Sequence, residues 1–214
     1  MHMNISAAAD RYRHVRRAYH SWRIHLSLSR KVMLSFGIAC IIGLCAQIKF
    51  GLPWTPVPVT GQTFAVLLAG ILLGGRWGAA SVLMYIAGGT IGIPWFSGWS
   101  GGTAVLGGPT AGYIAGFIPA AYSIGWITEK YVKTRRIVPL LLLMAGANFL
   151  LIHIPGLIIL GIFLFGTTGT FPSLTVLLAA GSLPFIAGDV FKIIAAALAG
   201  SALAPGSRDE TVNC

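Results

Sequence analysis

Six long apolar runs, separated by short polar or glycine-rich stretches, constrain this 214-residue chain more than any other feature. A helix needs about 20 apolar residues to cross a bilayer, and each run reaches or approaches that length. The predicted spans are 32–50, 60–75, 78–93, 110–128, 137–165 and 180–204. Only 9% of the residues are charged, against about 25% in an ordinary soluble domain. The sequence therefore predicts an all-α integral membrane protein with six transmembrane helices.

Prolines and glycines predict interruptions in the last two spans and a long loop in the middle of the chain. Proline lacks a backbone N–H and disturbs the preceding helical turn, so Pro155 and Pro184 are expected to kink or end helices in spans five and six. Residues 166–173 form an uncharged turn between these spans. Residues 93–109 combine many glycines with aromatic side chains, which favours a loop over a helix.

The basic residues predict how these spans are oriented. The chain carries 15 Lys and Arg residues against 5 Asp and Glu. In a six-span topology, thirteen of the basic residues fall on one side, in residues 1–31, at Arg76, in residues 129–136 and at Arg208, whereas Lys49 falls on the other. Because cytoplasmic loops are enriched in Lys and Arg, we expect both termini to face the cytoplasm. Bases that flank apolar runs in this way indicate topology rather than binding to nucleic acid.

Two tails flank the predicted membrane domain, residues 32–204. The basic tail, residues 1–31, places apolar and aromatic residues at helical spacing, so part of it is predicted to lie as an interfacial helix on membrane lipid. Together with the first apolar run, the tail also has features of a signal peptide or an organellar transit peptide, although a tail on the inner face is the simpler interpretation. Residues 205–214 form the C-terminal tail.

Asp189 is the only acid inside a predicted span, and Lys192 follows it by three residues, which places both side chains on one face of a helix. An unpaired charge in hydrocarbon costs at least about 2.5–3.5 kcal/mol, so such residues normally face a cavity or each other. Two interpretations remain open from spacing alone: a structural ion pair that anchors the sixth helix, or a pair that lines a pocket and binds a polar ligand. A carboxylate accepts from N–H groups and an ammonium neutralises an anion, so a small molecule with both features would suit the pair.

Other candidates depend on a single residue or a short pattern. Gln62 begins the second span, and His153 stands alone in an apolar run, where a histidine is more often an interior hydrogen-bonded group than a ligand. Ala39 and Gly43 form a small-xxx-small pair that would give a flat face for another helix. The sequence contains no phosphate-binding loop, metal-ligand spacing or nucleophile elbow. No metal, cofactor or catalytic residue is therefore predicted, and the chain is not expected to hydrolyse ATP by itself.

Three stretches, in this order, match the pattern of one known family: VPVTxQTFAVLLAG at 57–70, GxxGIPxFxGxSGGxxVLxGPTxGY at 89–113 and PFxxGDxxK at 184–192. The chain resembles the BioY family, whose members are the biotin-specific substrate-capture (S) components of energy-coupling factor (ECF) transporters. The resemblance covers about residues 33–204. The chain departs from the usual family pattern at Gly61, where a bulky apolar residue is common, and at Ala111, which replaces a glycine.

The resemblance implies a bundle of six membrane helices in a bacterial inner membrane, with a substrate pocket open to the outside. Loops at about 50–59 and 93–109 would cover this pocket. The family's acid and lysine on helix six match Asp189 and Lys192. Biotin carries ureido N–H donors and a carboxylate, so Asp189 is expected at the ureido end and Lys192 at the carboxylate. Weaker candidates for the walls or lid of the pocket are Phe96, Trp99, Tyr113 and Gln62.

Partners are implied by the same resemblance. Family members work with a membrane-embedded coupling subunit and two ATPases, and the face at Ala39 and Gly43 resembles the docking surface that such components present. Within the transport class, a sister vitamin or a biotin precursor such as dethiobiotin is an alternative ligand. An intramembrane lipid-modifying enzyme that uses Asp189 as acid or base is a further alternative, as is a structural subunit in which Asp189 and Lys192 only pair.

Overall fold

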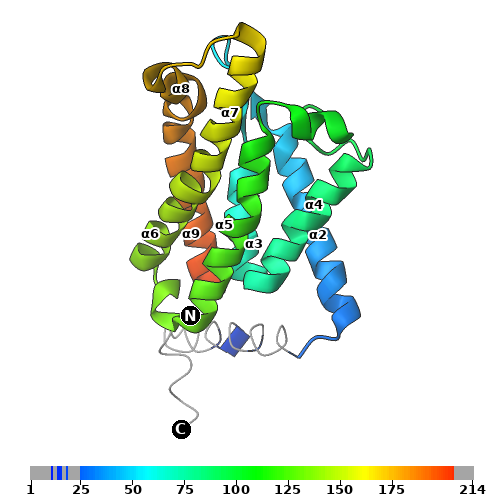
Figure 1. The fold of residues 1–214 in the computed structure, drawn as a ribbon. Helices are drawn as coiled ribbons and strands as arrows, with labels where there is room; N and C mark the ends of the chain where they lie inside the picture. Colours follow the sequence, from blue (N-terminus) through cyan, green and yellow to red (C-terminus); the bar gives the residue numbers. More distant parts are fainter. Residues whose placement is uncertain (1–10, 12–13, 16–17, 19–24, 205–214) are drawn as a thin grey trace, which may run out of the picture.

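Helices account for most of the regular structure in the computed structural model, which describes residues 11, 14–15, 18 and 25–204. The long helices run side by side in a single bundle (Figure 1). The six predicted spans correspond to the following elements: α2 (Leu28–Gln47); α3 (Gln62–Leu73); α4 (Gly75–Thr90); α5 (Ala111–Lys130); α6 (Ile137–Gly146), η3 (Ala147–Ile152) and α7 (His153–Thr168) as the fifth; and α8 (Leu174–Gly181), η4 (Leu183–Phe185) and α9 (Ile186–Leu203) as the sixth. The predicted six-helix architecture is thus confirmed. The predicted interfacial helix and the C-terminal tail fall mainly outside the described residues.

Three of these spans have the length and composition to cross a membrane on their own: Leu28–Gln47, Ile137–Thr168 and Leu174–Leu203. The second and third spans are shorter and are separated by a single residue, Gly74, whose backbone φ of 82° lies in the region that favours glycine. The first span begins at Leu28, four residues before its predicted start at residue 32.

The two prolines behave differently. Pro184 lies in η4, a short 3-10 turn that separates α8 from α9, so the predicted interruption of the sixth span is confirmed. Pro155 lies in the first turn of α7, and the fifth span continues through it after the π-helical turn η3. Gly112 and Gly116 of α5 face this segment, because a Cβ on Gly112 would overlap the carbonyl O of Pro155 and a Cβ on Gly116 that of Leu151. Small residues therefore let α5 approach the backbone of the interrupted helix closely.

Two connections lie together at the upper end of the bundle in Figure 1. The first contains the antiparallel pair β1 (Lys49–Phe50) and β2 (Val59–Thr60), with Lys49 opposite Thr60. The second follows α4 and contains a bridge between Phe96 and Ser100 and the 3-10 helix η1 (Thr103–Gly107), which confirms the predicted loop at 93–109. The side chain of Gln47 joins α2 to this loop, because its Nε2 donates to the carbonyl O of Phe96 at 3.1 Å.

Trp95, from the same loop, fills the space between α2 and α4. Its side chain is buried, its Nε1 donates to the carbonyl O of Tyr85 at 2.8 Å, and its ring lies 5.6 Å from that of Tyr85. A Cβ on Gly43 would lie 2.8 Å from the Cβ of Trp95, and one on Gly88 would overlap the indole ring. Ala39 is likewise fully buried. Ala39 and Gly43, predicted as a flat face for another helix and as a docking surface, are thus both buried inside the chain in this structure, and Gly43 packs against a tryptophan from a distant loop.

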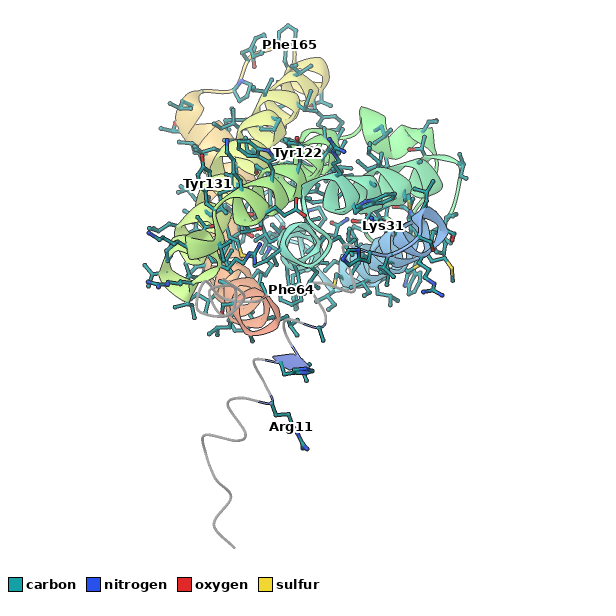
Figure 2. The ribbon with its side chains drawn as sticks, turned by 90° about the horizontal axis from the view of Figure 1, so that it is seen from below. Arg11, Lys31, Phe64, Tyr122, Tyr131 and Phe165 are labelled. Atoms are coloured by element: carbon teal, nitrogen blue, oxygen red, sulfur yellow. The ribbon has the colours of Figure 1, made fainter. Side chains whose placement is uncertain are left out.

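The described basic residues gather at the lower end of the bundle. They lie at the start of α2 (Arg30 and Lys31), at the start of α4 (Arg76), and from the end of α5 through η2 (Val132–Arg135) to Arg136. Figure 2 views this end directly and shows Lys31 and Tyr131 on it. Lys49 lies at the opposite end, in β1.

Candidate functional site

A cavity of about 310 Å³ lies between the helices near their upper ends, below the two connections. Its volume is at the lower end of the range typical of small-molecule sites, about 300–1,000 Å³. Its lining combines apolar and aromatic walls with a few charged and polar groups. The lining residues are Lys49, Pro56, Val57, Pro58, Val59, Thr60, Gln62, Thr63, Phe96, Ser97, Ser100, Val105, Gly108, Pro109, Thr110, Tyr113, Ile114, Phe117, Ile152, His153, Phe185, Asp189 and Lys192.

Asp189 lies on the first turn of α9 and is 2% exposed, yet it is well supplied with donors. Its Oδ1 pairs with the ammonium of Lys192 at 2.5 Å. Its Oδ2 accepts from Nδ2 of Asn148 at 3.0 Å and lies 2.8 Å from Nε2 of His153. A buried carboxylate needs such partners, because a charge removed from water without them is very costly. Three elements, α9, η3 and α7, therefore hold this one carboxylate in place.

Lys192 connects the sixth span to the β1–β2 pair. Besides pairing with Asp189, its Nζ donates to the backbone O of Thr60 at 3.0 Å, across 132 positions of sequence. Thr60 in turn donates from its hydroxyl to Oε1 of Gln62 at 2.7 Å, and Nε2 of Gln62 donates to the hydroxyl of Tyr85. Gln62, predicted as a weaker ligand contact, thus lines the cavity as part of a chain of hydrogen bonds between the helix-six pair and α4.

The sequence did not predict the contacts that His153 makes in the cavity. It is an interior hydrogen-bonded histidine, as expected, but it also lines the cavity and contacts Asp189. Its Nδ1 lies 3.0 Å from Oγ of Ser182. If Asp189 is ionised, its Oδ2 has to accept, so Nε2 of His153 carries a proton and donates to it. His153 thus links the two interrupted spans through its contacts with Asp189 and Ser182.

The predicted aromatic wall residues divide into two groups. Phe96 is 1% exposed and lines the cavity, with its ring edge-on to that of Tyr85 at 5.3 Å. Tyr113 also lines the cavity, and its hydroxyl donates to the carbonyl O of Gly181 at 2.6 Å. Trp99 is 67% exposed and does not line the cavity; its backbone N–H donates to Oε1 of Gln47. In this conformation Trp99 is a surface residue of the covering loop.

This arrangement suits a small molecule that has polar ends and an apolar body. A carboxylate that contacts three protein donors and a lysine with two acceptors each retain room for one more partner, because a carboxylate has about four acceptor positions and an ammonium has three donors. The aromatic and proline side chains around them would cover apolar parts of the ligand. The geometry brings together Asp189, Lys192, Gln62, Phe96 and Tyr113 of the predicted site, and adds His153.

The sequence pattern of the BioY family matches residues 15–209, nearly the whole chain. The chain belongs to the BioY family. Similar proteins include the Biotin transporter BioY of Rhizobium etli, which is 37% identical over 184 residues that cover 83% of this chain and 95% of the relative. The Probable biotin transporter BioY of Methanothermobacter thermautotrophicus is 46% identical over 138 residues, which cover 64% of this chain and 88% of the relative.

The fold is similar to one that is known from a crystal structure. That protein is described as the S-component for biotin from an ECF-type ABC transporter. It superposes with a TM-score of 0.72 at 24% identity, over 83% of this chain and 94% of the other. This BioY-family chain is therefore a membrane protein with an S-component fold.

Proposed function

We propose that this chain captures biotin in the membrane as the substrate-binding subunit of an ECF-type uptake transporter. The observation that carries the proposal is the Asp189–Lys192 pair, which lies in the wall of a cavity of ligand size. The names of the similar proteins from Rhizobium etli and Methanothermobacter thermautotrophicus support biotin as the ligand. A structural ion pair alone would not require a cavity beside it.

Biotin matches the groups that the cavity offers. Its ureido N–H groups can donate to the remaining acceptor position of Asp189, and its carboxylate can accept from the remaining N–H of Lys192. The fused rings and the alkyl chain can pack against the rings of Phe96 and Tyr113, which line the same cavity. Because Asp189 and Lys192 contact each other, they bind adjacent parts of a bent ligand or reach one end through a water molecule.

The orientation follows from the distribution of charge. Eight of the ten described Lys and Arg residues lie at or below the lower end of the bundle, whereas Lys49 is at the upper end and Lys192 is inside. The positive-inside rule then places the lower end in the cytoplasm and the cavity near the outer surface of the cell membrane. Both termini would be cytoplasmic, and biotin would enter from outside beneath the two covering connections.

Release to the inside requires energy from partners. A membrane-embedded coupling subunit and two ATPases would supply it, in keeping with the description of the similar crystal structure as part of an ECF-type ABC transporter. Since Ala39 and Gly43 are both buried inside the chain, Gly43 against Trp95, a coupling subunit would dock on other residues of this chain.

A lipid-modifying enzyme is the lower alternative, and one observation bears on it. Ser182, His153 and Asp189 form a continuous string of hydrogen bonds, which has the residue types of a nucleophile, a base and an acid. Ser182, however, does not line the cavity, so a substrate held there would not meet its hydroxyl. The named relatives are transporters, and ligand capture is the simpler use of the same residues.

The proposal is tested by calorimetric titration of the purified, partner-free protein in detergent with biotin, with thiamine and riboflavin as control ligands. Tight, selective, near-stoichiometric binding of biotin is expected. Dethiobiotin, titrated in parallel, separates the precursor alternative from biotin itself. Absence of binding by a sample shown to be folded, and without co-purified biotin, would refute capture of this vitamin while leaving the six-helix fold intact.

A further inference from the structure

The charges around the cavity are unequal in number, and the surplus comes from a residue outside the helix-six pair. Asp189 and Lys192 neutralise each other at 2.5 Å, and Nε2 of His153 lies 2.8 Å from Oδ2 of Asp189. Lys49 is the remaining charged residue among those that line the cavity, and within the described chain it makes no ion pair. A ligand anion placed beside a neutral pair gains hydrogen bonds but little net charge compensation. Among the lysine and aspartate side chains that line the cavity, the net positive charge is therefore that of Lys49.

The position of Lys49 is set by both covering connections. In β1 it stands opposite Thr60, the residue whose carbonyl O accepts from Lys192, so both lysines are held at the same short strand pair. Its side chain extends over the second loop, because a Cβ on Gly98 would overlap Nζ of Lys49. The φ of Gly98, 78°, lies in the region that favours glycine, which keeps this position free of a side chain that would displace the ammonium.

Ser97, beside Gly98, adds a second polar group without a partner. It lines the cavity, and its Oγ is buried and makes no hydrogen bond to any part of the chain that the structure describes. A buried hydroxyl that is left without a hydrogen bond loses its solvation by water without replacement, so most such groups find a partner. An oxygen of a bound anion at the ammonium of Lys49 would be a suitable acceptor, since Nζ of Lys49 lies over Gly98, the residue that directly follows Ser97.

We propose that Lys49 and Ser97 form an anion-recognition subsite at the mouth of the cavity, which selects ligands that carry a carboxylate. This inference rests on the proposed capture of a vitamin that contains a carboxylate, and it goes further by assigning charge selection to the two covering connections. Lys192 contributes a hydrogen bond to the ligand, whereas Lys49 supplies the charge that the ligand neutralises. Since Lys49 belongs to one connection and Ser97 to the other, a bound carboxylate also bridges them.

The test compares biotin with biotin amide, which keeps the ureido and apolar parts but is neutral. Lys49→Met is expected to weaken biotin binding about fivefold and to leave binding of biotin amide nearly unchanged, because an exposed ammonium contributes a modest, screened interaction. Lys49→Arg should retain the preference for biotin. Ser97→Ala should reduce the preference for biotin over biotin amide. Added salt should narrow the difference between the two ligands in the unaltered protein but not in Lys49→Met.

Lys133→Met, which removes a basic residue in η2 at the opposite end of the bundle, is the matched control and should change neither affinity. If Lys49→Met lost affinity equally for biotin and biotin amide, or for neither, the anion subsite would be overturned. The proposed capture of biotin would not be affected by that result. If the unaltered protein bound neither ligand, the proposed function would fail, and the subsite with it.

Discussion

The two sides of the bundle are built on different principles. On one side α2, α3 and α4 are uninterrupted helices whose buried side chains are apolar or neutral, and glycines of α2 and α4 pack against Trp95. On the other side the spans α6–α7 and α8–α9 are broken by a π turn and a 3-10 turn, and they carry Asn148, His153 and Asp189. The regular side supplies a firm apolar wall, and the interrupted side supplies the polar groups that face it.

This difference has a physical basis. A regular helix satisfies its own backbone and exposes side chains at fixed spacing, which suits close packing in lipid. A π turn or a proline changes that spacing and redirects side chains, and such turns are frequent at functional sites. Here the break at η3 lets Asn148 and His153 reach the same oxygen of Asp189 from within a single span. Lys192 then joins the interrupted side to Thr60 at the mouth of the cavity.

The largest effect is expected when Asp189, the acid of the interrupted side, is neutralised. Asp189→Asn keeps the size of the side chain but leaves the partly buried ammonium of Lys192 without its counter-ion, and breaking a fully buried pair costs about 3–5 kcal/mol. We expect biotin affinity to fall about 100-fold or more and the thermal stability in detergent to drop. Calorimetry and a thermal unfolding assay measure the two effects.

A double variant sharpens the same point. Asp189→Asn combined with Lys192→Met removes both charges, so its melting temperature should recover relative to Asp189→Asn alone, while biotin binding stays lost. Recovery of stability without binding would show that the pair matters for the ligand as well as for packing. If the double variant bound biotin like the unaltered protein, the pair would be purely structural.

The second prediction concerns His153, a positioning residue that acts through Asp189. His153→Phe keeps a ring in place but removes the donor to Oδ2, which is worth about 1.5–3 kcal/mol for a charged acceptor. We expect biotin affinity to fall about tenfold or more by calorimetry. His153→Gln, whose amide can donate, should recover part of the loss. Equal affinity for the Phe and Gln variants would indicate that only the shape of residue 153 matters.

The third prediction tests the regular side. Gly43→Ala places a Cβ 2.8 Å from the Cβ of Trp95, so either α2 or the loop must shift, at a cost of about 1–3 kcal/mol in the free energy of unfolding. Gly37→Ala is the matched control in the same helix, since no atom lies within 4 Å of its added Cβ. A lower melting temperature for Gly43→Ala alone is expected. Equal stability of the two variants would contradict the close packing of Trp95 on α2.

The contrast between the sides also explains what the sequence could predict. Asp189 and Lys192 were conspicuous because a charge in an apolar run is costly, and the six spans followed from hydrophobic length. Asn148 and His153 belong to a different span, and one polar residue in an apolar run gives no sign of its partner. The small pair Ala39 and Gly43 indicated close packing, but a small-xxx-small pattern does not identify what packs against it. The partner, Trp95, lies in a loop some 50 positions away.

The smallest effect on biotin affinity and thermal stability is expected at Asn148, because its side chain makes one favourable and one unfavourable contribution. Its Nδ2 donates to Asp189, but its Oδ1 is buried and has no hydrogen-bond partner in the described part of the chain. Asn148→Leu, of similar size, removes a useful donor and an unsatisfied acceptor together, so the two terms nearly offset each other. We expect biotin affinity and melting temperature to change by no more than the equivalent of about 1 kcal/mol.

Asn148→Asp gives the opposite result at the same position. It replaces the donor with a second carboxylate against Oδ2 of Asp189, and two buried acids at hydrogen-bond distance cannot both ionise without a large penalty. Binding of biotin and thermal stability should therefore both fall far more than in Asn148→Leu. A mild effect of Asn148→Asp together with a severe effect of Asn148→Leu would mean that the amide serves packing rather than the charge of Asp189, and the polar network of the interrupted side would then consist of His153 and Lys192 alone.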